Sequence, residues 1–182
     1  HSEGAWVAPI LAAEHSRLGF LILSAVPVTS RRESLRLANA ERLRNAGAST
    51  AEIARNREFF ERYQQAIIDN DAVSIEQLWR EYAGASWLPA VMPTAKTLND
   101  PNWQRARLTW PHEPGPVLGK IRCPVLAIWG AEDEEFMPRL HRPLFEQVML
   151  KARNTDATVR VIAGANHPFL KVAPSFTEVV GY

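Results

Sequence analysis

Cys123-Pro124-Val125-Leu126-Ala127-Ile128-Trp129-Gly130 is the stretch of this sequence that decides the fold. It is a short, continuous apolar run that contains a proline near its start and ends at a glycine, and its length is typical of a buried β-strand. Similar runs lie at residues 18–25 and 158–164, and an amphipathic helix is expected at 140–152. Strands that alternate with helices are typical of a parallel sheet. The sequence therefore predicts an α/β fold.

Two polar residues follow strands of this kind, and a serine precedes the earliest of them. Asp133 comes shortly after the stretch quoted above, and His167 comes after the run at 158–164. Ser2 lies in the segment His1-Ser2-Glu3-Gly4-Ala5, ahead of an Ala-rich stretch with apolar residues at helical spacing. Ser-x-Gly is the second half of the pattern G-x-S-x-G, in which the serine occupies a sharp strand-to-helix turn that exposes its hydroxyl. The first glycine of that pattern and the strand before it are not in this sequence.

The segment between the first two strands, residues 29–119, carries charged helical patterns and no strong strand pattern. One helix is expected to end at Gly47, and the capping-box pattern from Ser49 to Glu52 predicts the start of a second. The pattern Ser74-Ile75-Glu76-Gln77 predicts a third. A helical insertion of this size is expected to form a cap or lid over a site, and an ordinary helical subdomain packed on the sheet is the alternative.

The composition excludes several classes of protein and site. The 21 Lys and Arg residues are interspersed with 20 Asp and Glu residues, so the charge gives no case for binding nucleic acid or an anionic membrane. No stretch approaches the roughly 18 consecutive apolar residues that a membrane span needs. The single cysteine, Cys123, excludes an internal disulfide. No cluster of His, Cys and Asp has metal-ligand spacing, so we expect neither a metal nor a cofactor.

Three segments together resemble the catalytic segments of α/β-hydrolases: Ser2–Pro9, Ile121–Asp133 and Ile162–Phe169. Within that superfamily they are most similar to esterases and acyl hydrolases related to the prolyl-oligopeptidase and acyl-CoA thioesterase-like branches. Ala5 departs from the family, which often repeats a glycine there. The resemblance implies a partial α/β-hydrolase sheet, made of its last three strands, in the C-terminal catalytic part of a longer enzyme.

The resemblance also implies a division of the chain into three parts. Residues 1–28 are expected to hold the serine turn with its helix and the first strand of the core. Residues 29–119 are expected to form the helical cap. Residues 120–182 are expected to complete the C-terminal part of the core, with the acid loop and the histidine loop.

By the same resemblance, Ser2 is the nucleophile, His167 the base that becomes an acid, and Asp133 the residue that orients the imidazole. A base is needed because a serine hydroxyl is a weak nucleophile at neutral pH. The Gly-x-x-Asp spacing from Gly130 favours Asp133, and its acidic neighbours Glu132, Glu134 and Glu135 are the alternatives.

The oxyanion hole requires two donors aimed at the developing negative charge. The backbone N–H of Glu3, the residue after the nucleophile, is expected to supply one donor. The other is expected from a loop that this chain lacks. By the same resemblance, His1 is at the position of a residue that usually shapes the turn.

The expected activity is hydrolysis of a small-molecule carboxylic ester or thioester through an acyl-enzyme intermediate. A serine peptidase of the oligopeptidase type would use the same triad and remains an alternative. A non-catalytic fragment that assembles with a partner is another. Three strands out of an expected eight leave a bare edge and an uncovered apolar face, so a partner chain or a second copy is expected to complete the sheet.

Overall fold

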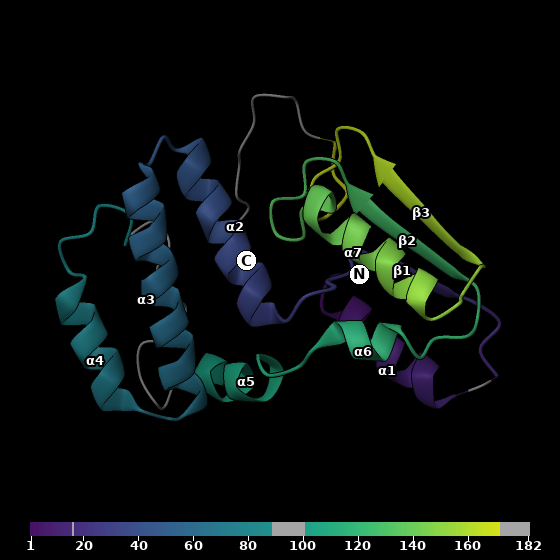
Figure 1. Ribbon diagram of the computed structural model, residues 1–182, viewed down its shortest axis with the longest axis horizontal. Helices are drawn as coiled ribbons and strands as arrows, with labels where there is room; N and C mark the ends of the chain where they lie inside the picture. The colour runs from purple at the N-terminus through teal and green to yellow at the C-terminus, as the bar shows by residue number, and fades with distance from the viewer. Residues whose placement is uncertain (16, 89–100, 172–182) are drawn as a thin grey trace. The chain divides into compact units, whose positions relative to one another are not determined.

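The computed structural model describes residues 1–15, 17–88 and 101–171 (Figure 1). The backbone contacts divide the chain into two compact units. The first unit comprises His1–Thr29 and Glu113–Tyr182, and the second comprises Ser30–His112. Residues 89–100 of the expected cap and residues 172–182 of the expected C-terminal part lie outside the described residues.

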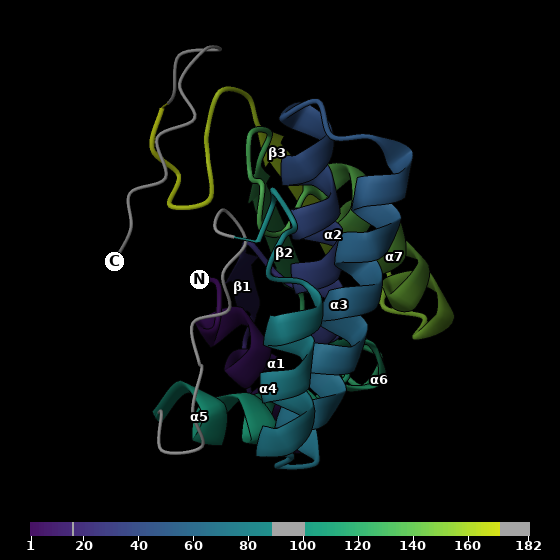
Figure 2. The ribbon, with the colours of Figure 1, turned by 90° about the vertical axis from the view of Figure 1, so that its left-hand side faces the viewer.

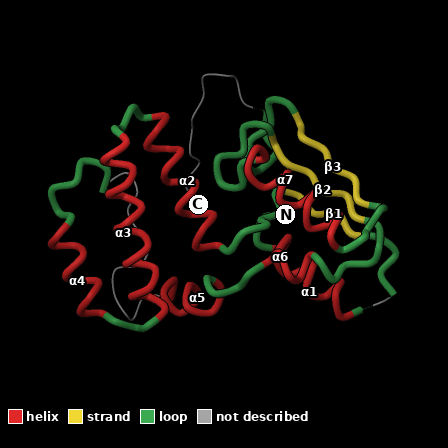
Figure 3. Tube along the Cα trace, viewed as in Figure 1, coloured by secondary structure: helices red, strands yellow, loops and turns green. Residues whose placement is uncertain are grey.

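The first unit is built on three parallel strands (Figure 3). They are β1 (Leu21–Ser24), β2 (Val125–Gly130) and β3 (Ala157–Ile162), and they lie in the order β1-β2-β3. The helices of this unit are α1 (Gly4–Glu14), α6 (Pro114–Leu118) and α7 (Pro138–Lys151). The α/β class and the three strands expected from the sequence are confirmed: β1 and β2 fall within the apolar runs that predicted them, and β3 begins one residue before its run.

One face of this sheet is covered by helices. Alternate residues of the strands point to this face, among them Leu23, Ala127 and the fully buried Trp129. They pack in one cluster with apolar residues of α1, α6 and α7, such as Trp6 and Phe145. Figure 1 shows α7 in front of the strands on this side, running along them. The strand ends are thereby fixed against a single apolar core.

The opposite face of the sheet is open within the described residues. Ile22 of β1 is 54% exposed and Ile162 of β3 is 44% exposed. Thr158 and Arg160 of β3 are also exposed. The run at 18–25 has the apolar character of a strand buried on both faces, but here only its Leu23 side is covered.

The second unit is helical, and three of its helices, α2 (Arg31–Asn45), α3 (Thr50–Ile68) and α4 (Ala72–Glu81), lie side by side (Figure 2). The predicted capping box is present at the start of α3, where the side chains and backbone N–H groups of Ser49 and Glu52 bond reciprocally. The third helix begins at Ala72, and its N-cap is Asp71 rather than Ser74: the Asp71 side chain accepts the Ser74 N–H. Asp71 thereby satisfies one of the N–H groups in the first turn of α4 that have no partner within the helix.

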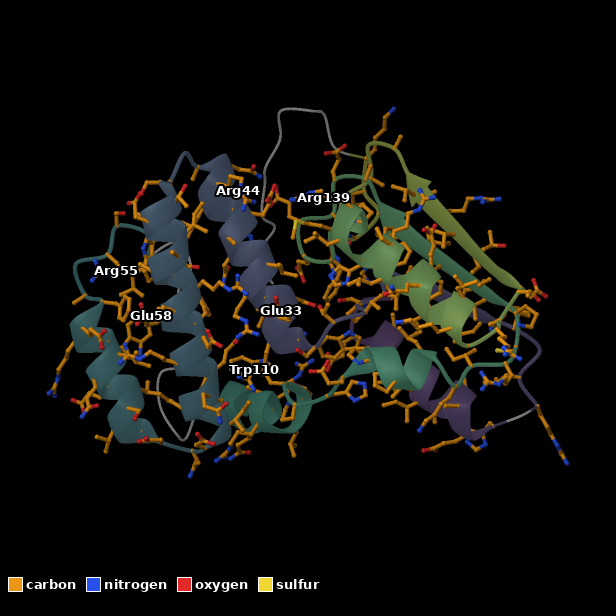
Figure 4. The ribbon with its side chains drawn as sticks, in the orientation of Figure 1. Glu33, Arg44, Arg55, Glu58, Trp110 and Arg139 are labelled. Atoms are coloured by element: carbon orange, nitrogen blue, oxygen red, sulfur yellow. The ribbon has the colours of Figure 1, made fainter. Side chains whose placement is uncertain are left out.

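An aromatic cluster fills the core of the second unit. The Phe59 ring stacks on Tyr63 at 5.7 Å and meets Tyr82 edge-on at 5.1 Å. Arg55, labelled in Figure 4 on α3, holds its guanidinium 5.1 Å from the centre of the Tyr82 ring. Trp110, at the end of helix α5 (Pro101–Thr109), packs against the same cluster. The sequence did not predict helices α5 and α6.

The helix α6 falls inside the range 29–119 that the sequence assigned to the cap, but its contacts group it with the first unit. A cap or lid role for the second unit stays a prediction. None of the described helices is long and apolar enough to cross a lipid bilayer.

Candidate active site

Ser2 lies in a tight turn directly before a helix. Its φ angle of +50° is in the left-handed region, which costs a residue other than glycine about 1–3 kcal/mol and persists only where the surrounding structure imposes it. The Ser2 N–H donates to the carbonyl of Ser24 at 3.0 Å, which ties the turn to the end of β1. The Gly4 N–H donates to the carbonyl of His1 at 2.9 Å, and α1 begins at Gly4. The serine hydroxyl is therefore held at the C-terminal end of the sheet.

Asp133 lies three residues beyond the end of β2 and is 2% exposed. One of its carboxylate oxygens, Oδ1, accepts the backbone N–H groups of Glu135 and Phe136, both at 2.9 Å. These two donors fix the orientation of the carboxylate. The other oxygen, Oδ2, faces His167.

The loop that carries His167 follows β3 and packs directly on the end of β2. The carbonyl of Ala165 accepts the Glu132 N–H at 2.9 Å. A Cβ atom on Gly130 would lie 2.2 Å from the Ala165 carbonyl oxygen and 2.5 Å from that of Asn166. Glycine at position 130 is therefore required for this close backbone approach, which the sequence pattern alone did not reveal.

The structure brings the three predicted side chains together. His167 Nδ1 lies 3.0 Å from Asp133 Oδ2, and His167 Nε2 lies 3.0 Å from Ser2 Oγ. Because an ionised carboxylate only accepts hydrogen bonds, Nδ1 carries the proton in the tautomer that satisfies this arrangement. Nε2 is then the acceptor for the serine hydroxyl. Within the described acid loop, Asp133 is the residue that bonds Nδ1.

The pKa of His167 is raised above its ordinary value of 6.5. Burial, the largest single effect, lowers this pKa, but the hydrogen bond and the charge of Asp133 together with the charge of Glu135 outweigh it. The imidazolium form is thus stabilised beside the serine.

Two aromatic side chains flank the imidazole of His167. The ring of His1 lies 4.9 Å from it, and the ring of Phe136 lies 5.4 Å from it, measured between ring centres. His1 Nε2 also donates to the backbone carbonyl of His167 at 2.8 Å. His1 therefore contacts the histidine loop besides preceding the serine in the turn. Phe136 contacts both His167 and Asp133: its ring lies beside the imidazole, and its N–H donates to the carboxylate.

His141 of α7 is fully buried next to this site. Its Nδ1 accepts the backbone N–H of Val28 at 3.2 Å, and its ring meets Phe136 edge-on at 5.6 Å. Burial lowers the pKa of His141 to about 4, against a smaller opposing effect of Asp133. His141 is thus a neutral packing residue.

The backbone N–H of Glu3 lies at the N-terminal end of α1, where Glu3 is the N-cap residue. The N–H groups at a helix start attract negative charge, which suits the predicted oxyanion donor. The described residues contain no group of three or more His, Cys, Asp or Glu side chains that could hold a metal ion.

No protein-family model matches this chain, and a search of curated proteins gives no match. The solved structures similar to this chain include two whose identity to it is 20% or less. One is BpoC from Mycobacterium tuberculosis H37Rv, a candidate non-heme bromoperoxidase, with 18% identity and a TM-score of 0.43 over 90% of this chain and 56% of BpoC. The other is a thermophilic esterase from Thermogutta terrifontis, with 20% identity and a TM-score of 0.41 over 90% of this chain and 54% of the esterase. The chain spans about half the length of each.

Proposed function

We propose that this chain carries the catalytic residues of a serine hydrolase of the α/β-hydrolase superfamily, acting on carboxylic esters or thioesters. The observation that supports this proposal is the pair of 3.0 Å contacts that His167 makes, one to Ser2 Oγ and one to Asp133 Oδ2. A nucleophile, a base and an orienting group in series are the minimum that acyl transfer by serine requires.

In the proposed reaction, Ser2 Oγ attacks the carbonyl carbon of the ester while its proton passes to His167 Nε2. The carbonyl oxygen of the tetrahedral intermediate takes the negative charge, and the Glu3 N–H donates to it. As the intermediate collapses, the bond from carbon to the leaving group breaks and Nε2 gives its proton to the departing oxygen or sulfur. Water then attacks the acyl-serine with Nε2 as base, and the acid product leaves as Ser2 regains its proton.

Asp133 keeps Nδ1 protonated throughout and stabilises the imidazolium that forms at each step. Its near-complete burial makes this electrostatic effect stronger than it would be at the surface. The two backbone donors on Oδ1 keep the carboxylate from rotating away from the imidazole.

The proposed enzyme takes two of its parts from residues outside this sequence. The second oxyanion donor is one part, since the acyl-transfer sites of this superfamily take this donor from a loop that precedes the serine. The open edge of β1 and the exposed Ile22 side of the sheet are the other part. We propose that further strands, from a partner chain, a second copy or a longer form of this chain, cover them.

Two alternatives use the same residues differently. A serine peptidase of the oligopeptidase type would need the same triad, and it is distinguished by cleavage of peptide amides at a rate comparable with that of esters. A non-catalytic fragment would keep the geometry but leave Ser2 unreactive.

A fluorophosphonate probe tests the proposal in the full-length protein, because it phosphonylates a serine only where a base activates it. We expect one label on the peptide that contains Ser2, lost in Ser2→Ala and strongly reduced in His167→Ala. The exposed Ser86, replaced as Ser86→Ala, is the control and should leave labelling unchanged. A wild-type protein in which Ser2 stays unlabelled would contradict the proposed function.

A further inference from the structure

Glu135 places a second carboxylate at the reactive nitrogen of His167. Its Oε2 lies 3.8 Å from His167 Nε2, the same atom that lies 3.0 Å from Ser2 Oγ. The Glu135 side chain is 53% exposed, so it lies where solvent reaches the site. Asp133, in contrast, is enclosed and contacts the other ring nitrogen. The chemistry of the triad does not use Glu135.

The backbone of Glu135 has a fixed position relative to the triad. Its N–H donates to Asp133 Oδ1 at 2.9 Å, so the backbone from which the side chain extends is held by Asp133. The other side chains that face His167 are the carboxylate of Asp133 and the rings of His1 and Phe136. Glu135 thus places a charged side-chain atom within 4 Å of Nε2.

The leaving group of the substrate has to come to this same nitrogen. Nε2 delivers the proton to the departing oxygen or sulfur, which requires hydrogen-bond distance at that step. A carboxylate 3.8 Å from Nε2 then lies within a few ångströms of the leaving group. We propose that Glu135 is a specificity-determining residue that makes the enzyme favour uncharged or cationic leaving groups over anionic ones. This inference rests on the proposed hydrolase function.

The size of the effect follows from Coulomb's law. Two unit charges about 5 Å apart, screened as in water, have an interaction energy that corresponds to a rate change of about four-fold. Removal of the Glu135 charge should therefore change the rate for a charged leaving group by about this factor. Salt weakens the effect, because the Debye length falls from about 10 Å at 0.1 M to about 3 Å at 1 M ionic strength.

Glu135 also acts on the base itself. Its charge is one of the effects that raise the pKa of His167. The base has to be neutral to accept the serine proton, so Glu135→Gln should move the acidic limb of kcat/KM for a neutral ester to lower pH. A residue with only a structural role would change the rate without moving this limb.

Three aryl acetates that differ in charge provide the test with the full-length protein: phenyl acetate, meta-carboxyphenyl acetate and meta-(trimethylammonio)phenyl acetate. The measured quantity is kcat/KM for the anionic ester divided by kcat/KM for phenyl acetate. Differences in intrinsic reactivity cancel when this ratio is compared between variants. We expect Glu135→Gln to raise the ratio about four-fold and Glu135→Lys to raise it further, with the opposite change for the cationic ester.

Glu132→Gln is the matched control, since it removes the same charge from an exposed side chain of the same loop. Its ratio should stay within about two-fold of wild type, because the interaction falls with distance and is screened. In the wild-type enzyme, 1 M NaCl should raise the anionic-to-neutral ratio towards that of Glu135→Gln, a measurement that needs no variant to fold.

Equal ratios in wild type and Glu135→Gln, together with a salt-independent wild-type ratio, would overturn this inference while leaving the proposed function intact. Failure of the proposed function looks different: turnover of all three esters would then be absent, or would persist in Ser2→Ala.

Discussion

Gly130 and Ala165 are in direct backbone contact: a Cβ atom on Gly130 would lie 2.2 Å from the Ala165 carbonyl oxygen. This contact seats the histidine loop on the end of β2, the strand that also leads to Asp133. The distance between His167 and Asp133 therefore depends on a position that takes no part in the chemistry. A methyl group there has no room, because the obstructing atoms belong to the backbone.

Gly130→Ala should consequently displace the histidine loop and impair catalysis more than it impairs folding. A shift of about 1 Å in a catalytic group lowers the rate about 100-fold, so we expect a loss of that order in kcat/KM for phenyl acetate. The control is Gly119→Ala, since a Cβ at position 119 would make only ordinary contacts, the nearest at 3.6 Å. Activity and Tm are measured for both. Wild-type activity in Gly130→Ala would show that the position of the histidine loop does not depend on the contact between Gly130 and Ala165.

His141 should make the protein sensitive to mild acid. Its pKa is about 4 when folded, against 6.5 ordinarily, so the unfolded chain binds a proton more readily. The stability that neutral His141 contributes is complete above pH 6.5 and is lost as the pH falls towards 4, by a total of about 3 kcal/mol.

Urea unfolding of wild type and His141→Asn between pH 4 and 7 measures this loss. Asparagine keeps an acceptor for the Val28 N–H but does not titrate, so the variant should have a flatter dependence of unfolding free energy on pH. His15→Asn, at an exposed position, should keep the wild-type slope. Parallel slopes for wild type and His141→Asn would contradict the neutral, buried state of His141.

The triad should respond to mutation as a unit. Ser2→Ala and His167→Ala should each lower kcat by about 10⁶, and the double variant should lose no more than either single one. Asp133→Asn should cost less, about 10⁴, because the nucleophile and base remain but the tautomer is wrong. Additive losses in the double variant would mean that Ser2 and His167 act in separate steps.

The open face of the sheet should make the 182-residue chain associate when it is produced alone. Ile22→Lys places a charge on that face and should shift the species seen by size exclusion with light scattering towards the monomer. Val73→Lys is the matched control, since Val73 is also exposed but lies on α4 of the other unit. A monomeric wild-type chain would remove the reason for expecting a partner at this face.

Much of the fold could be predicted because its signals are local in the sequence. The run at 123–130 contains β2, and the Ser49–Glu52 pattern marks the start of α3. The start of α4 was predicted three residues late, since Asp71 competes with Ser74 as the cap and the sequence pattern does not rank them. Helix α6 was missed because its five residues include two prolines, which favour a loop as readily as a first helical turn.

The sequence could single out the three predicted site residues because each one follows or precedes a recognisable strand. The contacts of three further residues with the site depend on how the loops fold, and no local pattern predicts them. These residues are Gly130, Glu135 and Phe136. Glu135 was considered as a substitute for Asp133, but the structure puts its carboxylate at the other nitrogen of His167. Asp133 and Glu135 are two residues apart in one loop, yet they lie at opposite nitrogens of the imidazole. No periodicity in the sequence predicts the conformation of such a loop.

The central claim is that Ser2 becomes acylated, and trapping of the acyl-enzyme tests it most directly. The full-length protein is mixed with para-nitrophenyl acetate, quenched in acid within the first turnover and digested for peptide mass spectrometry. The account predicts an acetyl group on Ser2, formed at the rate at which nitrophenol appears and absent from Ser2→Ala. An unmodified Ser2 in a protein that still turns over the ester, or the acetyl group on another residue, would contradict it.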